Sequence, residues 1–293
     1  MRPAINSERP AVPFTRLETL WMQVGGTVCN LSCTHCFISC GPRNYSHQMM
    51  ALPQVRSYLE EARELGVKDY YITGGEVFLN PEIFPILAAI LEQGPLVILT
   101  NGTLLAQDKA ERLRDVQNSS FHPIQLRISM ESFDEAENDH IRGNNAYRLA
   151  VAGIRNLVHC GFSPILTITR NWDEDQDHAM EKKFLAFLRE NGVTLPKIKI
   201  LPGFLMGRLA ETQRPYEDDE RVTEKCFEDY DITSLQCASS RMATGKGVYV
   251  CPILVDQEPA RMGPTLKETL RPYPLAHPAC YTCRVTGMTC KNP

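Results

Sequence analysis

Residues 29–41, CNLSCTHCFISCG, place four cysteines close together: Cys29, Cys33, Cys36 and Cys40. This spacing is compatible with disulfide bonds or with a zinc site of four thiolates. It is also compatible with an iron–sulfur cluster that is held by three thiolates and leaves one iron open. The rest of the sequence distinguishes disulfide bonds, a zinc site and an iron–sulfur cluster, because each is typical of a different cellular compartment or a different fold.

Composition limits the classes of protein that the chain can belong to. Its 293 residues carry a net charge of −4, which gives no electrostatic reason to expect a nucleic-acid partner. No apolar run approaches the length of a membrane span, so no membrane association is expected. The first residues, MRPAINSERPAVPF, lack the apolar core of a secretory signal. We therefore expect a cytoplasmic protein.

The cysteines fall into two groups. Eleven cysteines are present, an odd number that makes a poor disulfide framework in a reducing compartment. Four lie in residues 29–40 and five lie in residues 237–290, while Cys160 and Cys226 stand apart. Two separate clusters of thiols favour two metal sites.

Strand-like and helix-like segments alternate between residues 18 and 205. The expected strands are 18–26, 68–75, 95–102, 124–130, 163–171 and 197–203. The expected helices lie near 53–65, 81–93, 104–116, 145–160 and 178–191. This alternation predicts an α/β fold with a parallel sheet covered by its crossover helices. Six strands are too few for a closed eight-stranded barrel and favour a partial, TIM-like (β/α)6 barrel.

The regular alternation ends near the charged stretch ETQRPYEDDE, residues 211–220. We therefore predict an N-terminal extension over 1–17, the partial barrel over 18–210 and a small cysteine-rich domain over 211–293. Polar residues and glycines stand at the carboxyl end of each expected strand, where parallel β/α folds carry their chemistry. The first strand is followed by Cys29, and the second ends in the sequence TGGE, residues 73–76.

C-x3-C-x2-C after the first strand and TGGE after the second resemble the radical S-adenosylmethionine (radical SAM) superfamily over most of residues 20–210. The resemblance implies that Cys29, Cys33 and Cys36 hold a [4Fe–4S] cluster whose open iron binds S-adenosylmethionine. It also implies reductive cleavage of that cofactor to a 5′-deoxyadenosyl radical, which abstracts a substrate hydrogen. Cys40 is then a bystander. A zinc site that includes Cys40 is the alternative.

The resemblance also implies a binding site for S-adenosylmethionine. Its candidate residues are Gly74, Gly75, Glu76, Asn101, Ser129, Glu131, Arg142 and Asn171. The two glycines permit close backbone approach, and Glu76 is suited to accept hydrogen bonds from the methionine ammonium. His35 occupies a position that lies near the adenine in this family. For Ser129, Glu131 and Arg142, a purely structural role fits the sequence equally well.

The second group of cysteines resembles the SPASM/Twitch extensions of radical SAM enzymes. VYVC, residues 248–251, precedes a C-x2-C pair, but the spacing C-x2-C-x6-C to Cys290 departs from the SPASM pattern. We expect one auxiliary [4Fe–4S] cluster. Its expected ligands are Cys237, Cys251, Cys280 and Cys283, with Cys290 as an alternate. A structural zinc site is the competing prediction, because four thiolates suit zinc equally well.

Two [4Fe–4S] clusters and S-adenosylmethionine are thus the expected cofactors. An auxiliary cluster that accepts an electron permits oxidative modification of a small molecule or peptide by dehydrogenation, crosslinking or rearrangement. A flavodoxin- or ferredoxin-type protein is the expected electron donor. The alternative to an enzyme is a non-enzymatic zinc or iron–sulfur scaffold that has the same fold and binds a partner.

Overall fold

The computed structural model describes residues 9–288. Its main sheet has the strand order β10-β9-β8-β2-β3-β4-β5-β6-β7. These strands are β2 (Thr19–Met22), β3 (Asp69–Ile72), β4 (Leu96–Thr100), β5 (Ile124–Ser129), β6 (Ile165–Thr169), β7 (Lys197–Leu201), β8 (Ser240–Thr244), β9 (Gly247–Tyr249) and β10 (Arg261–Gly263). Strands β2 to β7 are parallel neighbours in chain order. The predicted partial, parallel barrel is confirmed.

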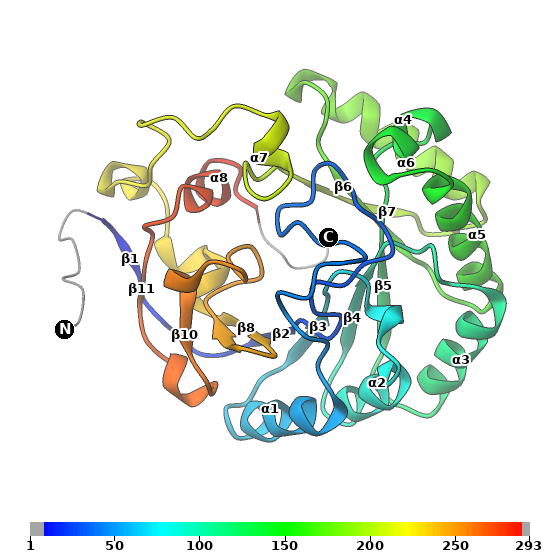
Figure 1. Cartoon of the computed structure of the whole chain (residues 1–293), viewed down its shortest axis with the longest axis horizontal. Helices are drawn as coiled ribbons and strands as arrows, with labels where there is room; N and C mark the ends of the chain where they lie inside the picture. The colour runs from blue at the N-terminus through cyan, green and yellow to red at the C-terminus, as the bar shows by residue number, and fades with distance from the viewer. Residues whose placement is uncertain (1–8, 289–293) are drawn as a thin grey trace.

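Helices cover the outer face of this sheet, and they form an arc around the strands in Figure 1. They are α1 (Leu52–Glu64), α2 (Ile83–Leu91), α3 (Gln107–Asn118), α4 (Glu135–Arg142), α5 (Ala146–His159) and α6 (Asp177–Glu190). All five expected helices are present. Helix α4 was not predicted, because it is short; Asp134 caps it by accepting a hydrogen bond from the Glu137 amide at 3.0 Å.

The sheet is buried on both faces, because successive side chains along a strand point in opposite directions. On β2, Leu20 and Met22 pack against the outer helices. Trp21 faces the barrel interior, where its ring stacks on Tyr71 with centroids 4.3 Å apart. The interior face is therefore built from residues at every second strand position, and these residues are the ones available to line a site.

The C-terminal region continues the same sheet. Strand β8 pairs with β2 in parallel, from Thr19 opposite Ser240 to Met22 opposite Ala243. Strands β9 and β10 then add antiparallel pairs. A second, two-stranded sheet joins β1 (Ala11–Val12) to β11 (Tyr273–Pro274). The predicted boundary at residue 210 stays a prediction.

The region between the barrel and the end of the described chain contains two short helices, α7 (Leu209–Thr212) and α8 (Ala279–Val285). Both lie beside the open side of the barrel in Figure 1. Among residues 9–288, no helix has the combination of length and apolar character that a bilayer crossing requires.

Candidate active site

A cavity opens at the carboxyl ends of the barrel strands, and we call it the barrel cavity. Nine of the predicted site residues line it: Cys29, Cys33, Cys36, Gly74, Gly75, Asn101, Ser129, Glu131 and Arg142. They come from the segments that follow β2, β3, β4 and β5, and from α4. Residues far apart in the sequence are thus brought together by the parallel order of the strands.

The three cysteines after β2 lie close enough to influence one another's ionisation. Burial raises the pKa of the Cys29 thiol to about 12, and nearby Cys33 and Cys36 add to this rise. Burial also raises the pKa of Cys33. Thiols whose pKa is raised in this way stay protonated unless a bound cation compensates the charge of the thiolate.

Cys40 lies beside the three predicted ligands and contacts one of them, Cys36. Its backbone amide donates to the Cys36 sulfur at 3.3 Å. A hydrogen bond from the Cys40 side chain lowers the pKa of Cys36 to about 6, against the opposing effect of burial. Cys40 thus contacts a predicted ligand, which the description of Cys40 as a bystander did not anticipate.

Arg208 braces the cysteine loop from the segment after β7. Its Nε donates to the Cys33 carbonyl at 2.7 Å, and its terminal nitrogen donates to the Cys40 carbonyl. Its backbone amide donates to the Cys36 carbonyl at 3.1 Å. A guanidinium holds several carbonyls in a fixed geometry because its donors form a rigid fork. This positioning role was not predicted from the sequence.

The glycines of the TGGE segment pack directly against the loop that carries Cys29. A Cβ added to Gly75 would lie 2.1 Å from the Val28 carbonyl oxygen, and one added to Gly74 would lie 2.5 Å from the Gly25 Cα. Real Cβ atoms do not approach so closely. The two glycines therefore let the ends of β2 and β3 approach each other closely, and their predicted contact with S-adenosylmethionine stays a prediction.

Glu76 is fully buried and is already hydrogen-bonded within the protein. Its carboxylate accepts from the amides of Phe78 at 3.0 Å and Asn101 at 2.8 Å, and from the Thr100 hydroxyl at 2.7 Å. Burial raises its pKa, whereas these hydrogen bonds act in the opposite direction. The described contacts tie the ends of β3 and β4 together, and Glu76 is not among the residues that line the cavity.

A charged cluster forms one wall of the cavity. Glu131 pairs with Arg142 of α4, and His35 Nε2 lies 3.0 Å from the same carboxylate oxygen. Burial alone would raise the pKa of Glu131, but Arg142 and His35 outweigh it and hold the pKa below its ordinary value. The Arg142 guanidinium also lies 4.0 Å from the Cys33 sulfur. The cluster therefore connects the cysteine loop to the end of β5.

The two predicted asparagines differ in position. The Asn101 side chain donates to Asn30 at 2.9 Å and lies 3.7 Å from the Cys29 sulfur. Asn171 is exposed and does not line the cavity. At the end of β6, Thr167 and Thr169 line it instead.

Two buried polar side chains of the cavity were missed in the sequence because they lie within strand-like apolar runs. Gln23 follows β2, and Arg127 lies in β5, where it donates to the Thr167 hydroxyl at 3.1 Å. The sequence did contain a signal for both: Gln23 is two residues after Trp21, and Arg127 is two residues before Ser129. Side chains two positions apart on a strand point to the same face, so each of these residues shares the inward face with its neighbour.

The second group of cysteines lines a separate, apolar cavity, which we call the auxiliary cavity. Its cysteines are Cys237, Cys251, Cys280 and Cys283. Burial raises the pKa of Cys237 and of Cys251, and it raises the pKa of Cys280 to about 12. Cys226 does not line this cavity, and the alternate Cys290 lies outside the described residues.

The two cavities lie toward opposite ends of the β2–β8 pair. Cys29 follows the carboxyl end of β2, whereas Cys237 precedes the amino end of the parallel strand β8. Cys251 follows β9, which runs back to that amino end. A five-residue strand spans about 16 Å. Ile253 and Met288 line both cavities and thus form a shared wall.

Arg241 of β8 braces the auxiliary cavity as Arg208 braces the first. Its guanidinium donates to the carbonyls of Cys237 at 2.7 Å, Ser240 at 2.6 Å and Arg271 at 3.0 Å. Two further hydrogen bonds reach the Thr269 carbonyl at 3.0 and 2.8 Å. Burial lowers the pKa of Arg241 to about 10.

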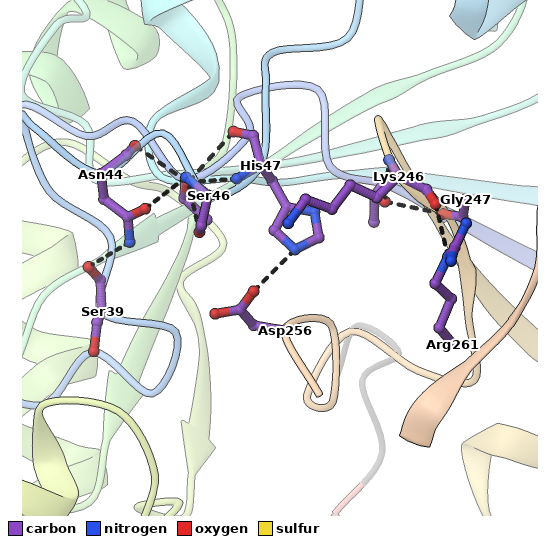
Figure 2. A network of polar contacts seen from close by, with 10 residues as sticks. Ser39, Asn44, Ser46, His47, Lys246, Gly247, Asp256 and Arg261 are labelled. Carbon is purple, nitrogen blue, oxygen red and sulfur yellow. Dashed lines mark hydrogen bonds and ion pairs between the residues drawn. The ribbon is translucent and has the colours of Figure 1, made fainter. Parts of the chain in front are cut away.

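A polar network connects the segment after the cysteine loop to the C-terminal region, and Figure 2 shows His47 pointing toward Asp256. The His47 Nε2 lies 3.0 Å from the Asp256 carboxylate. The neighbouring residues Ile253 and Val255 line the barrel cavity. The pair therefore fixes one wall of the cavity to the segment that follows the cysteines.

Within the described residues, no three histidine, cysteine or acidic side chains are arranged to hold a single metal ion. A four-iron cluster is wider than one ion and is bound by thiolates around its corners. The donor chemistry of the barrel cavity suits such a group, since three thiols line the same cavity.

The Radical SAM superfamily matches residues 24–181 of this chain. The match includes the cysteine loop and the TGGE segment and extends over more than half of the sequence. The chain therefore belongs to the radical SAM superfamily, whose cofactors are S-adenosylmethionine and a [4Fe–4S] cluster.

Relatives of several activities resemble the chain. A GTP 3′,8-cyclase of Pectobacterium atrosepticum is 28% identical over 183 residues, which are 59% of this chain and 52% of the relative. The mycofactocin maturase MftC of Mycobacterium tuberculosis is 26% identical over 178 residues, which are 59% of this chain and 42% of the relative. The chain thus spans about half the length of the curated relatives it matches.

Among solved structures, Streptococcus suis SuiB bound to its precursor peptide SuiA superposes with a TM-score of 0.65. The sequence identity is 14%, and the match covers 87% of this chain and 64% of SuiB. At this identity the likeness supports the fold alone.

Proposed function

We propose that the chain is an enzyme that uses Cys29, Cys33 and Cys36 to hold the [4Fe–4S] cluster of its family. The observation that carries this proposal is the convergence of the three thiols with the TGGE glycines in one cavity. When bound, the cluster and S-adenosylmethionine supply a 5′-deoxyadenosyl radical that takes a hydrogen atom from the substrate.

The protein's part in this chemistry is to bind and orient the cofactor. We propose that Gly74, Gly75, Asn101 and Ser129 contact S-adenosylmethionine, because they line the cavity beside the cysteines. Glu131 and Arg142 support His35 and the cysteine loop through their ion pair.

Glu76 remains a candidate for the methionine ammonium. A carboxylate has about four acceptor sites, and three protein donors use only part of them. Asn171 is the weakest candidate, because its side chain is exposed and lies outside the cavity.

We further propose a second [4Fe–4S] cluster on Cys237, Cys251, Cys280 and Cys283. Four thiols in an apolar cavity support it, and Arg241 fixes the carbonyl of the first of them. Zinc suits four thiolates equally well, so metal analysis must distinguish the two. In this proposal residues 211–293 act as the auxiliary-cluster domain, and residues 18–210 act as the catalytic barrel.

The proposed reaction is oxidative modification of a peptide or small molecule inside the barrel. The positions of the two cavities support it, because a substrate between them would face the radical on one side and an electron acceptor on the other. MftC is named a maturase, and the SuiB structure contains a precursor peptide, which favours a peptide substrate. We propose a flavodoxin- or ferredoxin-type electron donor and a cytoplasmic location. No observation favours the non-enzymatic scaffold.

The test is anaerobic purification followed by analysis of metal and of S-adenosylmethionine cleavage. We expect about eight irons per chain if both sites hold four-iron clusters. Replacing Cys29, Cys33 and Cys36 with Ala should abolish 5′-deoxyadenosine formation while the iron of the auxiliary site remains. Cleavage that persists in the triple variant would refute the ligand assignment, and zinc in place of iron at the second site would refute the auxiliary cluster.

A further inference from the structure

Gln23 is a buried polar residue that faces the barrel cavity without a protein partner. It follows β2, and its backbone amide donates to the Ala243 carbonyl at 2.9 Å, which fixes its position. Its side chain has 0% exposure, and it lines the cavity together with Trp21. Within the described part of the chain, neither its Oε1 nor its Nε2 has a hydrogen-bond partner.

A glutamine in this position is unfavourable for folding. An amide that loses water without gaining a hydrogen bond destabilises the native state. Apolar residues line the cavity beside Gln23, among them Trp21 and Met242, which are paired on β2 and β8. A leucine or methionine would suit such a wall better, so packing alone does not account for the amide.

We propose that Gln23 recognises an amide group of the substrate, and this inference rests on the proposed function of the barrel cavity as the substrate site. Its Oε1 would accept the N–H of a peptide bond, and its Nε2 would donate to the C=O of that bond or of a neighbouring residue. A peptide bond is neutral and offers one donor and one acceptor, so it satisfies both atoms of the carboxamide.

A carboxylate is the competing ligand, because Arg127 also lines the cavity. A carboxylate accepts hydrogen bonds but donates none, so it would leave Gln23 Oε1 unpaired. An ester has the same defect, because it lacks the N–H. The structure therefore favours a substrate that presents a backbone or side-chain amide to the end of β2.

The experiment uses full-length protein loaded with its clusters and S-adenosylmethionine under anaerobic conditions. The probes are a pool of acetyl- and amide-capped tripeptides, the matched pool in which every amide is replaced by an ester, and the acetyl-capped pool that ends in a free carboxylate. Retention of each pool is measured by equilibrium dialysis and mass spectrometry. The variants are Gln23→Leu and Gln23→Glu. The control is Gln125→Leu, in which the lost side chain donates to the Ser163 carbonyl outside the cavity.

We expect wild type and the Gln125→Leu control to retain the amide pool at least about tenfold better than the ester pool, since a lost buried hydrogen bond changes affinity by about that factor. Gln23→Leu should lose this preference. Gln23→Glu keeps an acceptor for the N–H but lacks the donor for the C=O, so it should retain both pools less well than wild type. Gln23→Leu should also unfold at the same temperature as wild type or higher, because an unpaired buried amide has been removed.

Three results would overturn the inference: equal retention of the amide pool by wild type and Gln23→Leu, a preference for the ester or carboxylate pool, or no retention by wild type. A fall in the unfolding temperature of Gln23→Leu would show a structural role instead. Formation of 5′-deoxyadenosine by wild type is measured in the same preparations. Its absence refutes the proposed function, whereas its presence without an amide preference refutes only the role of Gln23.

Discussion

Replacing Arg241 with Met should destabilise the protein and loosen the auxiliary cavity. The guanidinium makes five hydrogen bonds to four carbonyls, and it also stacks over the Phe14 ring at 4.5 Å. Each carbonyl left unpaired costs about 1–3 kcal/mol, although removal of a buried charge offsets part of this loss. We expect a net loss of about 3–5 kcal/mol, in the range observed when one partner of a buried charged contact is removed.

The assay is anaerobic thermal unfolding together with iron analysis. For a chain of this length, each kcal/mol shifts the midpoint by roughly 2 °C, so a fall of roughly 5–10 °C is expected. The variant should also lose iron, because the Cys237 backbone is no longer fixed. Arg241→Lys should recover part of the stability, since it keeps the charge but not the fork of donors.

Arg221→Met is the matched control, because Arg221 is more than half exposed and pairs only with the exposed Asp218 among the described contacts. It should unfold close to wild type. An Arg241→Met protein that unfolds within about 1 kcal/mol of wild type and keeps all its iron would refute the bracing role.

Three further predictions concern the cysteine loop and its surroundings. Arg208→Met should lower the iron content and destabilise the protein by about 1–3 kcal/mol, because partly buried carbonyls of the loop lose their donor; unchanged iron would contradict this. Gly75→Ala should displace the loop and abolish cofactor cleavage, whereas Gly203→Ala, whose Cβ would meet only a Leu side chain at 3.2 Å, should retain it. Burial lowers the pKa of His47 below its ordinary 6.5, while Asp256 opposes the shift and Lys246 favours it. The unfolded chain therefore binds the proton more readily, so stability should fall as pH decreases below about 6.5. His47→Asn should flatten this dependence below about pH 6.5, and an unchanged pH profile would be evidence against it.

The sequence was sufficient to predict the parallel barrel and the position of the first cysteines. Apolar strands, separated by helices that end near glycines, determine the order of the sheet, and local patterns of this kind are visible without a structure. The interior polar residues were less accessible. Gln23 and Arg127 lie in apolar runs, and only the direction of the strand shows that they face the cavity.

Contacts between distant segments could not be predicted from local patterns. Arg208 and Arg241 act on carbonyls, which carry no sequence signature. Glu76 was predicted from its motif, but its described hydrogen bonds are all within the protein. The parallel pairing of β8 with β2 joins residues about 220 positions apart, and nothing in either short strand specifies its partner.

That pairing has a consequence for how the protein must be produced. Strand β2 has β3 on one side and β8 on the other, so its second edge stays open until residues 240–244 have left the ribosome. An unpaired, apolar strand edge is a template for aggregation. A fragment that ends at residue 210 should therefore associate with other chains through β2. The strand that precedes Cys29 therefore gains its full set of neighbours only when the strand after Cys237 has been synthesised.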